Sequence, residues 1–96
     1  MLFGNRIKEL REAQGLLQRQ LAAVLGVDVP MFSKIERGDR RAKRKHVVIL
    51  AQQLNVSEEE LLSLWLADKI IDAIDNDSNV GLSALNVVHK ELSFQI

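Results

Sequence analysis

Positive charge is concentrated in one short stretch of this sequence, residues 34–45, which read KIERGDRRAKRK. These positions hold seven of the thirteen lysine and arginine side chains, although the chain as a whole carries no net charge. Clustered ammonium and guanidinium groups bind polyanions, because each neutralised phosphate releases condensed counterions. The stretch therefore indicates a binding surface for an anionic partner.

The charges divide the chain into a basic half and an acidic half. Residues 1–50 hold eleven Lys or Arg and five Asp or Glu, a balance of +6, whereas residues 51–96 hold two and eight, a balance of −6. Such an asymmetry indicates an anionic partner for the first half. Nucleic acid is the leading candidate, and an anionic membrane surface is the second.

Residues that commonly carry catalysis or bind metals are sparse. The chain has no cysteine, and His46 and His89 have no serine or carboxylate arrangement around them. We interpret the row formed by Asp68, Asp72 and Asp75 as a solvated helix face rather than a metal or acid–base site. The sequence therefore predicts a protein that is not an enzyme and that has no metal or cofactor site.

Length and composition predict a single helical domain. The chain has 96 residues, of which 47% are hydrophobic, with five glycines and one proline. So few turn residues favour helices over a β architecture, and the absence of cysteine is typical of a reducing compartment. No apolar run approaches the ~18 residues of a membrane span, and the N-terminus lacks a signal-peptide pattern. We therefore expect a cytoplasmic protein.

The elements that must position the basic stretch are predicted from helical periodicity. Glycines at 15, 26 and 38 are expected to end the first three helices, and Asp28 is the expected N-cap of the third. Ser57 and Glu60 predict a capping box for the fifth helix. The six helices are expected at about residues 3–14, 18–25, 28–37, 43–54, 57–74 and 80–92, with a polar break at 75–79 and a tail at 93–96.

The helix at 57–74 changes its apolar face part-way along. One side of its first half carries Leu61, Leu62, Leu64 and Trp65. Roughly the opposite side carries Leu66, Ala67, Ile70, Ile71, Ala73 and Ile74. Two interpretations remain open: a kink near Ala67 keeps both faces inside one monomer, or the second half leaves the domain and packs on another chain. Trp65, an aromatic residue among leucines, is expected in the core.

Residues 18–38 have the types and offsets that a helix-turn-helix requires. Ala22 is small enough to let two helices cross closely, and Gly26 permits a tight left-handed turn between them. The positions that would fill the shared core are all apolar: Leu21, Leu25, Val27, Phe32 and Ile35. The outer face of the second of these helices is left free.

This stretch, GLLQRQLAAVLGVDVPMFSKIERG, resembles the helix-turn-helix of the phage-repressor/Cro (Xre) class of bacterial DNA-binding regulators. The resemblance runs from about Phe3 to Leu64. It rests on the usual residue types of that class at Gln18, Ala22, Gly26, Ser33, Ile35, Glu36 and Gly38. It implies a five-helix domain that inserts the helix at about 29–37 into the major groove of double-stranded DNA, usually as a dimer.

The resulting expectation is an all-α fold. It comprises a five-helix repressor-like helix-turn-helix domain whose fifth helix is extended, followed by an added C-terminal amphipathic helix. We place the DNA-binding domain at residues 1–66 and a helical extension for dimerisation at 67–96. The residues expected at the dimer interface are Leu66, Ile70, Ile71, Ile74, Leu85, Val88 and Leu92.

The expected DNA contacts fall into two groups. Base edges are expected to be read by Val29, Pro30 and Met31, through thymine methyl groups, and by the polar side chains of Lys34 and Arg37. Phosphates are expected to be contacted by Gln18, Arg19, Ser33, Arg40, Arg41, Lys43, Arg44 and Lys45. Gln18 has the alternative of capping its own helix, because Leu17 occupies the position where the class usually has a Ser or Thr cap. Glu36 is expected to pair with a nearby arginine.

The function predicted from these features is sequence-specific DNA binding by a homodimeric regulator of transcription, expected to be a repressor. Three alternatives remain open. The first is an antitoxin that binds a toxin and represses its own operon. The second is a controller of a restriction–modification system, and the third is a protein-interaction module that no longer binds DNA.

Overall fold

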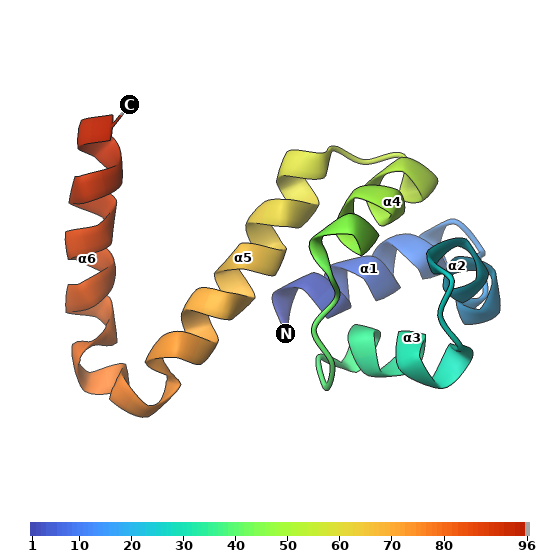
Figure 1. Cartoon of the computed structure of the whole chain (residues 1–96), viewed down its shortest axis with the longest axis horizontal. Coiled ribbons are helices and arrows are strands. Elements are labelled where there is room, and N and C mark those ends of the chain that lie inside the picture. Colours follow the sequence, from blue (N-terminus) through green and yellow to red (C-terminus); the bar gives the residue numbers. More distant parts are fainter. Residues whose placement is uncertain (96) are drawn as a thin grey trace.

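A computed structural model describes residues 1–95, and over this range the chain is all-helical, without a strand (Figure 1). The predicted all-α class is therefore confirmed. In chain order the elements are α1 (Leu2–Ala13), α2 (Gln18–Leu25), α3 (Val29–Arg37), α4 (Arg44–Leu54), α5 (Glu58–Ile74), the 3-10 helix η1 (Asp75–Asp77) and α6 (Ser78–Gln95).

Local capping signals set most of the helix ends. Gly26 and Gly38 end α2 and α3 with left-handed φ angles of 71° and 80°, which favour glycine. The Asp28 carboxylate accepts the backbone N–H of Met31 at 2.8 Å, as expected of an N-cap. Ser57 accepts the N–H of Glu60 at 3.0 Å. The predicted capping box is nevertheless wrong in its second half, because the Glu60 carboxylate instead pairs with Arg6 of α1 at 3.0 Å.

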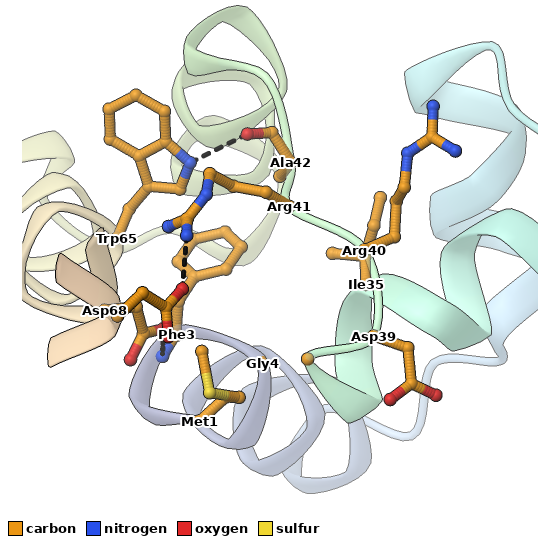
Figure 2. Close-up of a pocket in the computed structure, with 12 residues that line it drawn as sticks. Met1, Phe3, Gly4, Ile35, Asp39, Arg40, Arg41, Ala42, Trp65 and Asp68 are labelled. Carbon is orange, nitrogen blue, oxygen red and sulfur yellow. Dashed lines mark hydrogen bonds and ion pairs between the residues drawn. The ribbon is translucent and has the colours of Figure 1, made fainter. Parts of the chain in front are cut away.

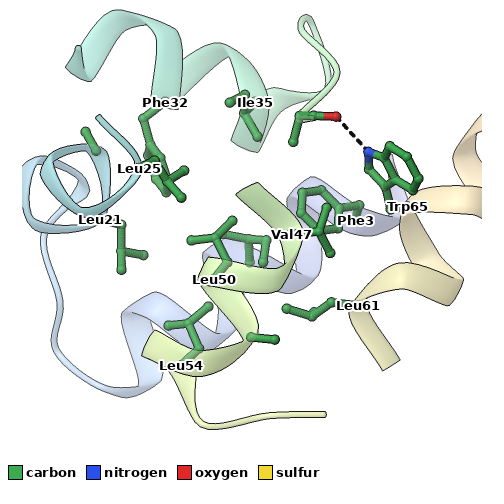
Figure 3. Packing of buried hydrophobic residues seen from close by; sticks show 14 residues of the cluster. Phe3, Leu21, Leu25, Phe32, Ile35, Val47, Leu50, Leu54, Leu61 and Trp65 are labelled. Atoms are coloured by element: carbon green, nitrogen blue, oxygen red, sulfur yellow. Dashed lines mark hydrogen bonds between the residues drawn. The ribbon is translucent and has the colours of Figure 1, made fainter. Parts of the chain in front are cut away.

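One hydrophobic core joins α1 to α5 (Figure 3). It consists of Phe3, Ile7, Leu21, Ala22, Leu25, Phe32, Ile35, Ala42, Val47, Leu50, Ala51, Leu54, Leu61 and Trp65. Trp65 is buried, as predicted, and its indole Nε1 donates to the Ala42 carbonyl oxygen at 2.8 Å. This bond ties α5 to the segment that leads from α3 into α4.

The start of α1 is capped by a residue from the far end of the fold. The Asp68 carboxylate on α5 accepts the backbone N–H groups of Leu2 and Phe3, each at 3.0 Å. Asp68 is buried, so the prediction that it belongs to a solvated face is wrong. The free N–H groups of a helix N-terminus attract a carboxylate, and this attraction explains why an acidic residue is stable inside the fold.

The C-terminal helices differ from the prediction in two respects. The kink interpretation is wrong, because α5 runs unbroken through Ala67 and its outer apolar face, which includes Leu66 and Ile70, is exposed. The predicted tail is also helical as far as Gln95. Figure 1 shows α6 standing apart from the five-helix body. Over the described range, no helix is long and apolar enough to cross a membrane.

Candidate nucleic-acid interface

The helix α3 presents a buried face and a free face. Phe32 and Ile35 point into the core, and Figure 1 shows α3 along one edge of the body with α1, α2 and α4 on its other side. At 100° per residue, the outward face is formed by Pro30, Ser33, Lys34 and Arg37. The fold thus leaves one side of a short helix unobstructed, which is what insertion into a groove requires.

A buried ion pair fixes the angle of α3 against α1 and α2. The Glu36 carboxylate, in a residue that is 4% exposed, accepts Arg11 Nε at 2.7 Å and Gln18 Nε2 at 2.8 Å. Arg11 also donates to the Leu16 carbonyl oxygen at 2.9 Å. Hydrogen bonding to Glu36 raises the pKa of Arg11. The expectation that Glu36 pairs with an arginine is confirmed, and Gln18 contacts α3 rather than its own backbone.

The base-reading candidates do not all lie on the outward face. Pro30, Lys34 and Arg37 are exposed and lie on it, and Val29 is exposed at its margin. Met31 is partly buried and packs against the core. The structure therefore brings four of the five candidates together and places Met31 on the flank of the helix.

The polar groups at the end of α3 bind one another. Arg37 donates to Ser33 Oγ at 2.9 Å and to the Asp39 carboxylate at 3.0 Å. Both partners of the Arg37–Asp39 ion pair are largely exposed, so the pair contributes about 0–1 kcal/mol. Arg37 can leave Asp39 for a base or a phosphate at little cost.

The loop after α3 separates its two arginines. Arg40 is exposed, and in Figure 2 its side chain points away from Trp65 and Arg41. Arg41 instead forms an ion pair with Asp72 of α5, beside a cavity of about 200 Å³ between the loop, α1 and α5. In the free protein Arg40 is available to a phosphate, whereas Arg41 is already paired.

Cations surround the N-terminus of α4. Lys43 is its N-cap residue and makes no side-chain cap, and Arg44 and Lys45 follow in the first turn, all exposed. Arg44 borders a surface depression on α5 that Glu58 and Glu59 also line. The free N–H groups and positive end of the helix dipole add to the charge of the two lysines. On α2, Arg19 is exposed as well.

His46 lies directly behind this cluster and predicts a dependence of stability on pH. Its residue is 8% exposed and its Nδ1 atom has no hydrogen-bond partner. Burial, together with the positive charges of Lys45 and Lys43, lowers the pKa of His46 from its ordinary value of 6.5. As the pH falls below 6.5, the unfolded chain therefore binds a proton at His46 more readily than the folded chain, and the folded state loses stability.

We therefore expect a lower melting temperature at about pH 5.5 than at about pH 7.5, measured by circular dichroism. His46→Gln removes the titrating group and is expected to reduce this difference. His89→Gln, at an exposed histidine, is the control and should retain it. An unchanged difference in His46→Gln would contradict this explanation.

The acidic partner of Arg41 was not foreseen, and it yields a prediction about DNA affinity. Asp72→Asn removes the charge that holds Arg41 and leaves the arginine free for phosphate. Because a partly exposed ion pair contributes about 0–1 kcal/mol, the expected gain in affinity is up to about five-fold. Fluorescence anisotropy with labelled duplex DNA measures it. Asp75→Asn makes the same change in net charge nearby, and an equal gain in that control would show that the Arg41 contact is irrelevant.

Within residues 1–95, no group of three or more His, Cys, Asp or Glu lies where it could hold a metal ion. The helix-turn-helix family model matches residues 7–61, which include α2, α3 and α4, part of α1 and the start of α5. The chain belongs to the helix-turn-helix family of transcriptional regulators.

Two relatives from Bacillus subtilis (strain 168) support this assignment. The chain is 35% identical over 60 residues to the uncharacterized HTH-type transcriptional regulator YazB, covering 62% of this chain and 87% of YazB. It is 31% identical over 85 residues to the SPbeta prophage-derived uncharacterized HTH-type transcriptional regulator YonR, covering 88% of this chain and 79% of YonR. No solved structure matches this helix-turn-helix chain. The YonR match is longer than residues 1–66, so it extends into the C-terminal helices.

Proposed function

We propose that this helix-turn-helix protein is a sequence-specific, double-stranded DNA-binding repressor of transcription that acts in the cytoplasm as a homodimer, without a cofactor or enzymatic activity. The observation that carries the proposal is the free outer face of α3, flanked by the cations of the following loop and of the α4 N-terminus. A short exposed helix beside a row of positive charge fits a major groove bordered by two phosphate backbones.

The phosphate contacts are proposed to come from two sources. Arg19, Arg40, Arg41, Lys43, Arg44 and Lys45 supply charge, and Gln18 and Ser33 supply hydrogen-bonding groups. Six cationic contacts correspond to a slope of about −5 per protomer in a plot of log affinity against log salt concentration. These contacts orient the protein on the duplex and do not select its sequence.

Base recognition is proposed to use the apolar start of α3 together with two cations. Pro30, Val29 and, from the flank, Met31 contact thymine methyl groups, while Lys34 and Arg37 donate to guanine acceptors. Replacing individual thymines of a bound site by uracil should weaken binding where a methyl group is contacted. Absence of an effect at every thymine would rule out the methyl contacts.

The homodimer is proposed to join through the exposed apolar residues of α5 and α6. Two protomers then present their α3 helices to major-groove faces about one turn apart on a near-palindromic site, and occupancy of such a site blocks transcription. Sedimentation of the wild type and of an Ile70→Glu/Ile74→Glu variant tests this interface. The wild type is expected at twice the 10.8 kDa of one chain, and the variant as a monomer.

The proposal as a whole is tested by selecting bound duplexes from a random pool at two salt concentrations. We expect one motif with two half-sites, recovered at both concentrations and with lower yield at the higher. Recovery of no enriched sequence at either concentration would contradict sequence-specific binding.

A further inference from the structure

The end of α5 and the whole of α6 form two arms that meet at a close contact. A Cβ atom added to Gly81 would lie 3.0 Å from Ile74 Cδ1, so the two helices touch at this point. Within Ser78–Gln95, Gly81 alone is buried. Figure 1 shows the arms diverging from the turn formed by η1. The contact at Gly81 is therefore the vertex of a V-shaped unit, here called the α5–α6 V and comprising residues 66–95.

Both inner walls of the α5–α6 V are apolar, and they become more exposed away from the vertex. Residues four and seven or eight positions apart share a helix face, so each wall can be followed outward from Ile74 or Gly81. Along α5 the exposed fraction rises from partly buried Ile74 to Ile70 at 39% and Leu66 at 52%. Along α6 it rises from partly buried Leu85 to Val88 at 47% and Leu92 at 54%. An open apolar wedge results.

The accessible surface and the radius of gyration of the molecule are both larger than those of a compact chain of its length. Its accessible surface is 6600 Å², whereas a compact protein of 10.8 kDa is expected to expose about 5,500 Å². Its radius of gyration is 15.1 Å, against about 12.5 Å for a compact chain of this length. The excess of about 1,100 Å² exceeds the ~800 Å² that each partner buries in a stable complex. Contact with one further chain of similar size could bury this excess surface.

The residues of α6 identify the occupant as a second copy of this chain. Besides the inner wall, α6 carries Leu82 and Val87 on other faces, exposed by 72% and 63%. A helix that is apolar around most of its circumference is normally enclosed by protein, and helices in proteins owe most of their stability to tertiary packing of an apolar face. In each chain, α6 can therefore form one wall of its own α5–α6 V and also occupy the α5–α6 V of a second copy.

The charges at the ends of α6 favour an antiparallel arrangement of two copies. Asp75 and Asp77 precede the helix, and Lys90 lies near its other end, next to Glu91. When two α6 helices run antiparallel, the lysine of each approaches the aspartates of the other. An isologous pair of this kind closes with two-fold symmetry and leaves no further copy to add.

We propose that two chains interlock through the α5–α6 V, with α6 of each chain lying between α5 and α6 of its partner. The outcome is a bundle of four helices that buries both inner walls and most of the circumference of each α6. This arrangement rests on the homodimer of the proposed function and specifies how its two halves engage. It requires Ile70 of one chain to lie beside Val88 of the other.

The lack of any native cysteine makes this contact directly testable in the full chain. Affinity-tagged Ile70→Cys and untagged Val88→Cys are co-expressed, purified through the tag and oxidised. We expect a disulfide-linked pair of one tagged and one untagged chain. Co-expression of tagged Gln53→Cys, on the far helix α4, with untagged Val88→Cys is the control and should give no such pair. Circular dichroism checks that all variants retain the wild-type helical content.

Each result bears on the proposal separately from DNA binding. A wild type that sediments as a dimer but gives no mixed disulfide would overturn the interlocked arrangement and leave the homodimer intact. A wild type that sediments as a monomer at micromolar concentration would overturn both the interlocked arrangement and the homodimer. This outcome includes the case in which a different protein occupies the wedge. Retention of duplex DNA by the same preparations, measured in parallel, tests the DNA-binding function without reference to the dimer.

Discussion

Replacing Glu36 by alanine is expected to destabilise the folded protein by about 3–5 kcal/mol, because one member of a buried ion pair is removed and the other is left without compensation. Arg11 would keep its charge beneath α3, with its side chain 11% exposed, and the amide of Gln18 would lose its acceptor. Domains of this kind are stable by about 5–15 kcal/mol in total, so the variant would lose a large fraction of its folding free energy.

Urea denaturation followed by circular dichroism measures this change. The control is Glu9→Ala, which removes a carboxylate that pairs with Arg6 at 2.7 Å but is 68% exposed in its side chain. An exposed pair is worth about 0–1 kcal/mol, so the control should be nearly as stable as the wild type. Equal destabilisation of the two variants would show that burial of the Glu36 pair does not determine the free energy of unfolding that is lost.

The second large effect concerns DNA affinity. Replacing Lys43 and Lys45 by glutamine is expected to weaken DNA binding about 60-fold per half-site at about 0.1 M salt. Each phosphate contact contributes about 0.9 to the salt slope, which at this concentration corresponds to about eight-fold in affinity. Both side chains are exposed at the N-terminus of α4, so their removal is expected to leave the fold intact.

The control for this variant is Lys8→Gln, which removes an exposed lysine that lies outside both the proposed DNA-contacting residues and the α5–α6 V. Anisotropy titrations at several salt concentrations compare the two. We expect the salt slope to fall by about two in the first variant and to change little in the control. Similar losses in both would indicate that net charge, rather than position, governs binding.

Residues whose role is set by near neighbours were predictable from the sequence. Asp28 caps α3 and Gly26 and Gly38 end their helices because these roles depend on the local backbone. The core positions of α2 and α3 followed from the same periodicity. The positions of most candidate DNA-contacting residues on α2, on α3 and at the start of α4 followed from the same helix boundaries, whereas the flank position of Met31 and the pairing of Arg41 did not.

Residues whose role depends on distant partners were not predictable. Asp68 was expected in solvent because its helical position adjoins two other aspartates, but the start of α1 lies against it and supplies two N–H donors. Glu60 has the spacing of a capping box, yet Arg6 from α1 offers a charged partner instead. Asp72 lies thirty-one positions from Arg41, and nothing in its local sequence indicates that it pairs with an arginine of the loop proposed to contact DNA.

The contact between Arg41 and Asp72 also joins the two regions to which we assign proposed functions. Asp72 lies on α5 between residues that face the α5–α6 V, and Arg41 lies in the loop that is proposed to contact phosphate. The proposed dimerisation through α5 and the proposed DNA binding through the loop would therefore both involve the same helix. A substitution on the face of α5 toward the α5–α6 V is therefore expected to alter DNA affinity, and a substitution at the Arg41 contact is expected to alter dimerisation.

The most direct test of the central claim is the salt dependence of binding between the wild-type protein and duplex DNA. If the cations of residues 34–45 bind the phosphate backbone beside α3, affinity should be high at about 0.05 M salt and should fall with a slope of about −5 per protomer. Failure to bind any duplex at that low salt concentration, or an affinity that does not change with salt, would contradict it.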